Sequence, residues 1–238
     1  MLFATPAWAM LVVSCLGQVL AGCGAWGENT PDHLDFALPT FKFTVSTTSQ
    51  QWRMAPPGGI PNKVCAGPLA LATDCCSSPL AAPPIDCQQY PVACDPDDNY
   101  CALIFDMEDS VDVDLVTDVP DIAAAQGRVF SSVSLLSLTT TVTDIGELPI
   151  RSANLYVGPE DSESSSSPGT ALLSPISLMA GPNVVVPEAD AQQAFSNFAR
   201  NYQAPFSLLL SAHLVITGSA SPTGAGNFTV TGKARAYY

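Results

Sequence analysis

The sequence predicts an all-β fold, an antiparallel β-sandwich with one short helix and a disulfide-rich irregular insertion. Short apolar or alternating segments recur from residue 41 onward, as in proteins built from many short strands. Turn-forming residues separate these segments, because the 238 residues include 21 prolines and 16 glycines. Six of the eight cysteines fall within residues 65–101, where helical or strand periodicity is almost absent. These features together are typical of two packed sheets that carry one irregular insertion.

Residues 1–22 are predicted to be a signal peptide. They contain no Asp, Glu, Lys or Arg, and the apolar run ends in the letters LAGC, with its cysteine at position 23. This ending resembles the lipobox of bacterial lipoproteins, a likeness that covers only the first 23 residues. The resemblance implies lipidation of the Cys23 sulfur and cleavage after Gly22. Residues 23–37 would then form a lipid-anchored tether.

Two alternatives to lipidation are open from the sequence. No Lys or Arg precedes Lys42, so the positive charge that usually begins a signal peptide is missing. An ordinary signal peptidase would instead cut after Ala21, and an uncleaved segment would anchor the chain directly. Cysteine parity favours lipidation, because cleavage removes Cys15 and lipidation of Cys23 leaves an even set of six for pairing.

A lipid on Cys23 predicts a location in the cell envelope. Two acyl chains are enough for stable anchoring, whereas a body with a formal charge of −14 is repelled by an anionic bilayer. By resemblance to enterobacterial sorting, Gly24 after the cysteine favours the outer membrane, with the periplasmic or the surface face left open. The same acidic charge disfavours nucleic acid as a partner.

Residues 38–238 are expected to form one β-sandwich domain. Its first strand is indicated by Phe41, Phe43 and Val45, which alternate with polar residues as in a strand with one solvated face. Further strands are expected at residues 102–105, 111–115, 129–142, 153–157 and 184–186.

The C-terminal part is expected to contain one helix and a closing hairpin. A helix at about residues 187–202 is indicated by Pro187 in its first turn and by apolar residues at helical spacing. Residues 206–217 and 228–238 are both strand-like and flank a turn, so they are expected to pair with each other. His213 would lie on the polar face of the first of these strands.

Residues 62–101 are expected to be an irregular insertion held together by disulfides. A segment with so little periodic apolar sequence needs cross-links for its stability. The cysteines concerned are Cys65, Cys75, Cys76, Cys87, Cys94 and Cys101. Their pairing is open, apart from a bridge between adjacent Cys75 and Cys76, which would be strained. A zinc site is the alternative, although the region contains no histidine.

An acidic stretch is the most unusual feature after the lipobox. No Lys or Arg lies between Lys63 and Arg128, a gap that holds twelve Asp and Glu residues. Its densest part supplies the candidate metal ligands Asp95, Asp97, Asp98 and Asn99. Clustered carboxylate and carbonyl oxygens are the ligands that Ca²⁺ takes, although the spacing is not that of an EF-hand. A solvated acidic surface is the alternative interpretation, and Ca²⁺ is the one candidate cofactor.

No motif in the sequence identifies an activity. The serine-hydrolase elbow, the zinc-protease pair and the nucleotide-binding loops are all absent. We therefore expect a lipid-anchored protein with a non-enzymatic binding, adhesion or envelope-structural role and a protein or polysaccharide partner. Two alternatives are open: a hydrolase that uses carboxylates on envelope or extracellular polymers, and a carrier that holds an apolar ligand between its sheets.

Overall fold

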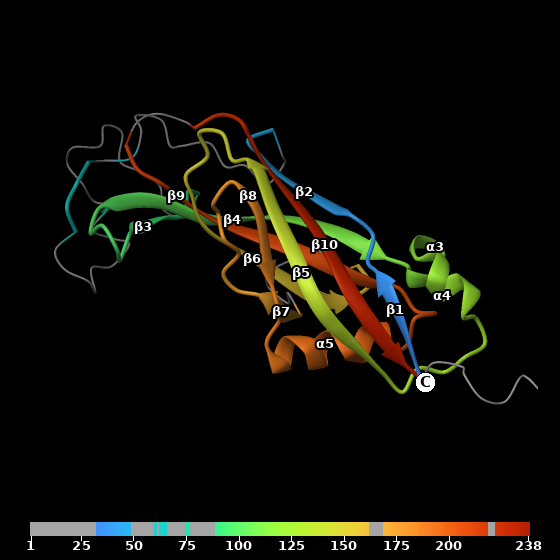
Figure 1. Ribbon diagram of the computed structural model, residues 1–238. Coiled ribbons are helices and arrows are strands. Elements are labelled where there is room, and N and C mark those ends of the chain that lie inside the picture. The colour runs from blue at the N-terminus through green and yellow to red at the C-terminus, as the bar shows by residue number, and fades with distance from the viewer. Residues whose placement is uncertain are drawn as a thin grey trace, which may run out of the picture. The chain divides into compact units, whose positions relative to one another are not determined.

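A computed structural model of the chain describes residues 32–48, 60, 62–65, 75–76, 89–161, 169–218 and 222–238. The chain divides into the units Met1–His33 and Leu34–Tyr238. The second unit is built from two antiparallel sheets with short helices beside them (Figure 1). The predicted all-β sandwich is therefore confirmed.

The first sheet has the strand order β1-β10-β5-β8, with β2 also paired to β10. These strands are β1 (His33–Ala37), β2 (Phe41–Ser46), β5 (Ser132–Asp144), β8 (Gly181–Val185) and β10 (Ala225–Tyr237). β1 and β2 follow each other along one side of β10, and β5 lies on its other side. At the break between them, the N–H of Leu38 donates to the carbonyl of Gly232 at 2.9 Å. A side chain at Gly232 would meet Leu38 there, which explains the glycine.

The second sheet has the strand order β3-β4-β9-β6-β7. These strands are β3 (Val92–Cys94), β4 (Cys101–Val113), β6 (Ile150–Pro159), β7 (Thr170–Leu173) and β9 (Phe206–Ile216). β9 is central, and all of its residues except His213 are buried. The predicted hairpin of residues 206–217 with 228–238 is wrong, because β9 and β10 lie in different sheets. β4 is hydrogen-bonded to one edge of β9 and β6 to the other, so neither edge is free to pair with β10.

The core lies between the two sheets and continues under helix α5 (Ala189–Ala199). The rings of Phe195 and Phe206 meet edge to face at 5.9 Å, and the N–H of Val133 donates to Ser196 Oγ at 3.1 Å. Figure 1 shows α5 beside β5 and β7. The helix is shorter than the predicted residues 187–202 but lies within them.

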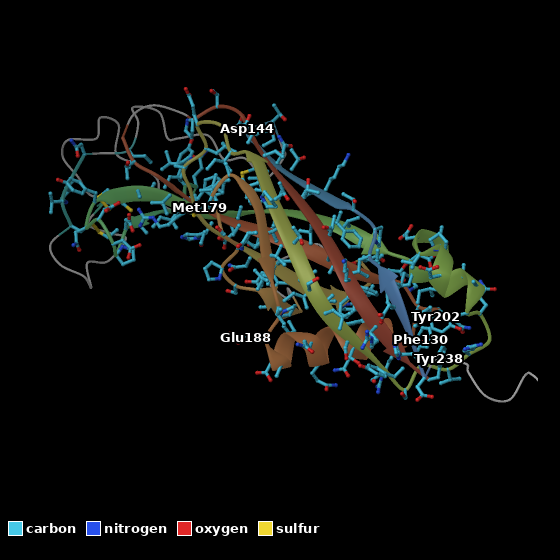
Figure 2. The ribbon with its side chains drawn as sticks, viewed as in Figure 1. Phe130, Asp144, Met179, Glu188, Tyr202 and Tyr238 are labelled. Atoms are coloured by element: carbon cyan, nitrogen blue, oxygen red, sulfur yellow. A yellow bond between two sulfur atoms is a disulfide. The ribbon has the colours of Figure 1, made fainter. Side chains whose placement is uncertain are left out.

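Aromatic residues fix the C-terminal end of the chain. Phe130, Tyr202 and Tyr238 gather at one end of the sheets (Figure 2), with the ring centre of Phe130 4.8 Å from Tyr202 and 5.7 Å from Tyr238. The hydroxyl of Tyr202 donates to the carbonyl of Arg128 at 3.0 Å. Phe130 and Tyr202 are buried, and buried aromatic rings whose polar atoms are satisfied are strong packing elements. Tyr238 is partly exposed and rests against Phe130 at the border of this group.

Residues 33–37 were expected to belong to the tether, but they form β1. Phe36 is buried, and Asp35 forms a two-point ion pair with Arg235 on β10. The alternation of Leu34 and Phe36 with polar neighbours is a strand signal that the Gly- and Pro-containing composition of the preceding residues obscured. The folded body therefore begins before residue 38.

The expected strands at 102–105 and 111–115 are one continuous strand, β4. It ends at Val113 because Asp114 caps the short helix α3 (Leu115–Asp118), accepting from the N–H of Val116 at 3.0 Å and of Thr117 at 3.2 Å. Helix α4 (Pro120–Ala124) follows directly. Leu115, which was expected in the strand, is the first residue of α3 and is buried.

Candidate functional site

Two disulfides join the segments before β3 to the β3–β4 hairpin. They are Cys65–Cys94 and Cys75–Cys101, and Cys94 lies opposite Cys101 across the two strands. The four sulfurs lie within 4.8 Å of one another. We call this end of the second sheet the tip, which comprises Ile60, residues 62–65, Cys75, Cys76, residues 89–103 and residues 216–218. Each disulfide closes a loop of 29 or 26 residues, a constraint of about 3–4 kcal/mol on the unfolded chain.

The structure confirms disulfides in the insertion, at five of the six predicted cysteines. Cys75 bonds to Cys101 rather than to adjacent Cys76, and Cys76 is itself disulfide-bonded. Cys87 and the predicted lipidation site Cys23 lie outside the described residues. The bonded sulfurs are part of a small apolar cluster with Ile60, Val92, Leu103 and Ile216, distinct from the main core. The tip is thus held by cross-links and a small core of its own.

The acidic residues 95–99 form the loop between β3 and β4. The N–H of Asp95 donates to the carbonyl of Tyr100 at 2.8 Å, and the N–H of Asn99 donates to the carbonyl of Asp95 at 2.9 Å. Asn99 has a φ of 57°, a left-handed conformation that asparagine tolerates better than most residues. The N–H of Asp97 also donates to Asp95 Oδ1 at 3.1 Å. These bonds give the loop one defined shape.

Three of the four predicted metal ligands converge on Arg151. Its Nη1 lies 2.7 Å from Asp95 Oδ1 and 2.9 Å from Asp97 Oδ2, and its Nη2 lies 2.8 Å from Asp98 Oδ2. The fourth, Asn99, contributes its backbone N–H to the loop. The guanidinium thus lies among the oxygens that were expected to bind Ca²⁺, and the Ca²⁺ site stays a prediction.

A β-bulge directs Arg151 toward this loop. The pairing of β6 with β9 shifts between Ile150 and Ser152, so Arg151 is the extra residue of the bulge. A bulge turns a side chain away from the regular alternation of its strand, which is how an arginine on β6 reaches a loop that follows β3. Nothing in the sequence around residue 151 marks a bulge, so sequence reasoning missed this residue.

Asp95 is the buried member of the cluster. Its side chain is 1% exposed, whereas those of Asp97 and Asp98 are 71% and 59% exposed. Burial alone would raise the pKa of Asp95, but the N–H of Asp97 and the guanidinium of Arg151 outweigh it and hold that pKa below its ordinary value. The hydrogen bond to Asp95 in turn raises the pKa of Arg151. Both groups are therefore charged at neutral pH.

Three acidic residues of β4 contact separate partners. Asp106 lies 2.8 Å from His213 Nδ1 on the outer face, where His213 is half-exposed as predicted. Asp112 accepts from the hydroxyl of Ser207 at 2.5 Å, and Asp109 accepts from the N–H of Thr44 at 2.7 Å. Each of these carboxylates supports the fold locally, and they do not gather at one point.

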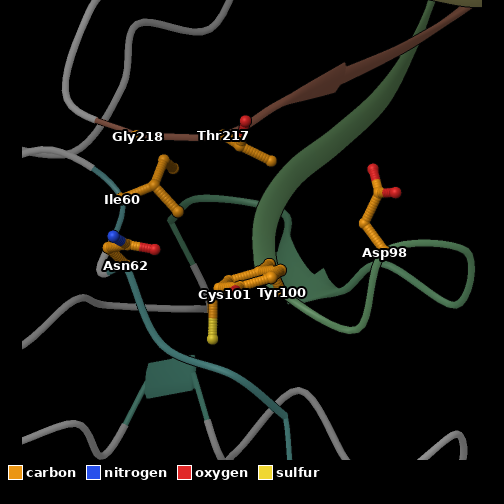
Figure 3. A pocket seen from close by; sticks show the side chains of 7 residues that line it. All are labelled: Ile60, Asn62, Asp98, Tyr100, Cys101, Thr217 and Gly218. Carbon is orange, nitrogen blue, oxygen red and sulfur yellow. The ribbon is translucent and has the colours of Figure 1, made fainter.

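A pocket of about 570 Å³ opens at the tip beside this loop. The described residues that line it are Ile60, Asn62, Asp98, Tyr100, Cys101, Thr217 and Gly218. Figure 3 shows the Tyr100 ring nearly edge-on at the bottom of the pocket. Ile60 and Thr217 lie above the ring in this view, with Asn62 to its left and Asp98 to its right. Asp98 is thus shared between the Arg151 cluster and the pocket.

Comparisons with known proteins assign no family to this chain. A scan against protein-family models found no match, and neither did a comparison with curated protein sequences. Among solved structures, one titled turnip yellow mosaic virus is similar with 14% identity and a TM-score of 0.27, over 57% of this chain and 81% of that chain. None of the helices in the described residues is long and apolar enough to span a membrane.

The pocket brings together residues that the sequence analysis did not connect. Asp98 was predicted as a ligand, but Tyr100, Asn62 and Thr217 were not singled out. Their only sequence signal is position, since Tyr100 lies between the acidic loop and Cys101, and Thr217 directly follows an apolar strand. The disulfides and the β4–β9 register bring these separate segments together.

Proposed function

We propose that this chain is a lipid-anchored protein of the cell envelope, attached through Cys23 to the outer membrane, with a non-enzymatic binding role. The binding site is the pocket at the tip, and its partner is a polymer or protein of the envelope or the extracellular space. The observation that carries the proposal is this pocket of about 570 Å³ beside two disulfides, a volume within the usual range for ligand sites.

The lining of the pocket favours binding over hydrolysis. Cleavage of a glycosidic bond uses two carboxyl groups that flank the bond, roughly 5–9.5 Å apart. Asp98 is the one carboxylate among the described residues that line the pocket, and its Oδ2 is held by Arg151. Asp95 and Asp97 bind the same guanidinium and are not part of the lining. The described residues thus supply a carboxylate for hydrogen bonding rather than an acid–base pair.

The disulfides support export of the chain. Cys65, Cys75, Cys76, Cys94 and Cys101 are all disulfide-bonded. Disulfides persist in oxidising compartments such as the periplasm and the cell surface, and they are rare in the cytosol. This agrees with the even set of cysteines that lipidation of Cys23 would leave. Export, cross-linking and anchoring are therefore parts of one proposal.

Labelling of cells with a palmitate analogue tests the anchor. The wild-type chain should carry the label and fractionate with the outer membrane, and Cys23→Ala should lose both properties. Cys15→Ala is the matched control, because it removes a cysteine of the same apolar segment and should stay labelled. Persistence of the label in Cys23→Ala would overturn the proposed anchor.

Photo-crosslinking in intact cells tests the binding site. A photoreactive residue in place of Val64, which is 58% exposed at the tip and pairs with Tyr100 without lining the pocket, should give discrete high-mass adducts. The same residue in place of Asn197, exposed on α5, is the control and should give none. Equal adduct patterns at the two positions, or none at Val64, would contradict a binding role for the tip.

A further inference from the structure

The pocket at the tip has an aromatic floor. Tyr100 is 40% exposed although it lies beside the buried Cys101, and its ring lies below the opening (Figure 3). The face of an aromatic ring carries partial negative charge and attracts the partly positive hydrogens of C–H groups. The flat C–H face of a sugar ring is a natural occupant of such a floor.

Polar side chains surround this floor. The amide of Asn62 both donates and accepts hydrogen bonds, the hydroxyl of Thr217 does the same, and the carboxylate of Asp98 accepts them. Figure 3 shows Asn62 and Asp98 on opposite flanks of Tyr100. Groups that donate and accept around an apolar platform match the hydroxyls of a sugar ring, each of which also donates and accepts.

Charge narrows the ligand class further. Asp98 is paired with Arg151 at 2.8 Å, so its negative charge is partly compensated and the carboxylate serves mainly as an acceptor. No lysine or arginine is found among the described residues that line the pocket, and the chain carries a formal charge of −14. An anionic ligand would therefore meet repulsion without a cationic partner.

The fold holds the lining residues in fixed positions. Cys101 is fixed by its disulfide, and the carbonyl of Tyr100 accepts from the N–H of Asp95 at 2.8 Å. Tyr100 also forms a β-bridge with Val64, and the N–H of Ile60 donates to the carbonyl of Gly218 at 3.2 Å. Groups that are already ordered lose little conformational freedom when a ligand binds. The cross-links of the tip thus serve the pocket as well as the fold.

We infer that this pocket binds a neutral saccharide unit of an envelope or extracellular polysaccharide, with the sugar ring stacked on Tyr100. Asn62, Asp98 and Thr217 hydrogen-bond the hydroxyls of the sugar, and no bond of the ligand is broken. The inference rests on the proposed binding role and names its ligand class. A basic protein segment that places a cation over Tyr100 is the competing occupant, and the experiment separates the two.

The test is calorimetric titration of the detergent-solubilised full chain with the neutral probes cellohexaose, mannohexaose and hexa-N-acetylchitohexaose, and with hexagalacturonate as the anionic probe. At least one neutral probe should bind, and hexagalacturonate should not. Tyr100→Ala should weaken that binding by about tenfold, whereas Tyr100→Phe keeps the ring and should bind as the wild type does. Tyr238→Ala is the matched control, because Tyr238 is 38% exposed and lies outside the pocket.

Three results would overturn the proposal of a neutral saccharide. They are no binding of any neutral probe, unchanged binding by Tyr100→Ala, or an affinity for hexagalacturonate equal to that for the neutral probes. Normal binding by Tyr100→Phe shows that the ring rather than the hydroxyl is needed, and a melting temperature of Tyr100→Ala close to that of the wild type shows that its loss of binding does not come from misfolding. Binding of hexalysine that depends on Tyr100 would identify the basic segment instead. In that case the saccharide fails while the crosslinks from position Val64 persist, so the proposed binding role stands.

Discussion

Arg151 Nη1 lies 2.7 Å from Asp95 Oδ1, although β4 and β9 separate their strands in the sheet order. The contact joins the start of β6 to the loop after β3 and fixes the acidic loop that borders the pocket. Three carboxylates meet one guanidinium here, which leaves an excess of negative charge around a buried Asp95. The stability of the tip therefore depends on one arginine.

Replacement of Arg151 by Gln should destabilise the protein. Asp95 would stay buried without its cationic partner, and loss of a hydrogen bond to a charged group costs about 1.5–3 kcal/mol. Denaturant titration should show a lower transition midpoint with an unchanged slope. Arg200→Gln, at an exposed position after α5, is the control and should change the free energy of unfolding by about 0.5 kcal/mol or less. Equal stability of the two variants would contradict this role of Arg151.

The same cluster should make stability depend on acid pH. The folded pKa of Asp95 is lowered, so it lies below the unfolded value of about 3.9. The unfolded chain then binds more protons as the pH falls, and the stabilisation, full above about pH 5, is lost as the pH passes through the folded pKa. Asp114 adds to the same trend, because its hydrogen bonds with Thr117 lower its pKa.

Melting curves between about pH 6 and pH 2 measure this effect. Asp95→Asn should flatten the acid limb of the stability profile, since the amide does not titrate. Asp121→Asn, on an exposed residue of α4, serves as the comparison and should keep the wild-type slope. An unchanged acid limb in Asp95→Asn would show that other groups control the acid sensitivity.

Sequence patterns predicted the parts of this fold that depend on local alternation and cysteine content. β2 follows from Phe41, Phe43 and Val45, all of which are buried, and the disulfides follow from the density of cysteines. The partners of β9 did not follow, because the strand is buried on both faces and its sequence does not reveal which strands lie beside it. Short sequence separation suggested β10, whereas tertiary packing selected β4 and β6.

The candidate site shows the same division. The acidic loop was visible as a run of aspartates, but its cation comes from a bulge 56 residues away from Asp95. Nothing in the sequence distinguishes Tyr100 from other aromatic residues, whereas in the structure it lines a pocket opposite Ile60 and Thr217. Sequence reasoning finds ligands that are neighbours in the chain and misses those brought together by strand register, which a single sequence does not encode locally.

Calcium should bind the acidic loop only when Arg151 is absent. The guanidinium and a Ca²⁺ ion compete for the same oxygens of Asp95, Asp97 and Asp98. We expect millimolar Ca²⁺ to leave the wild-type melting temperature unchanged and to raise that of Arg151→Gln. Mg²⁺, which prefers a stricter geometry and its own water shell, is the control and should have a smaller effect. Stabilisation of the wild type by Ca²⁺ would show that the ion binds beside the arginine.

Asp109 should protect the edge strand β2 from pairing with a second chain. The N–H of Thr44 points away from β10 and donates to Asp109 Oδ2 on β4 at 2.7 Å, so a carboxylate of one sheet occupies an open donor on the edge strand of the other. Unpaired edge donors invite pairing with a second chain. Asp109→Ala should lower the free energy of unfolding by about 0.5–1.5 kcal/mol and increase self-association in light scattering. Asp109→Asn keeps a side-chain acceptor and should stay monodisperse; association of both variants to the same degree would attribute the effect to lost charge instead.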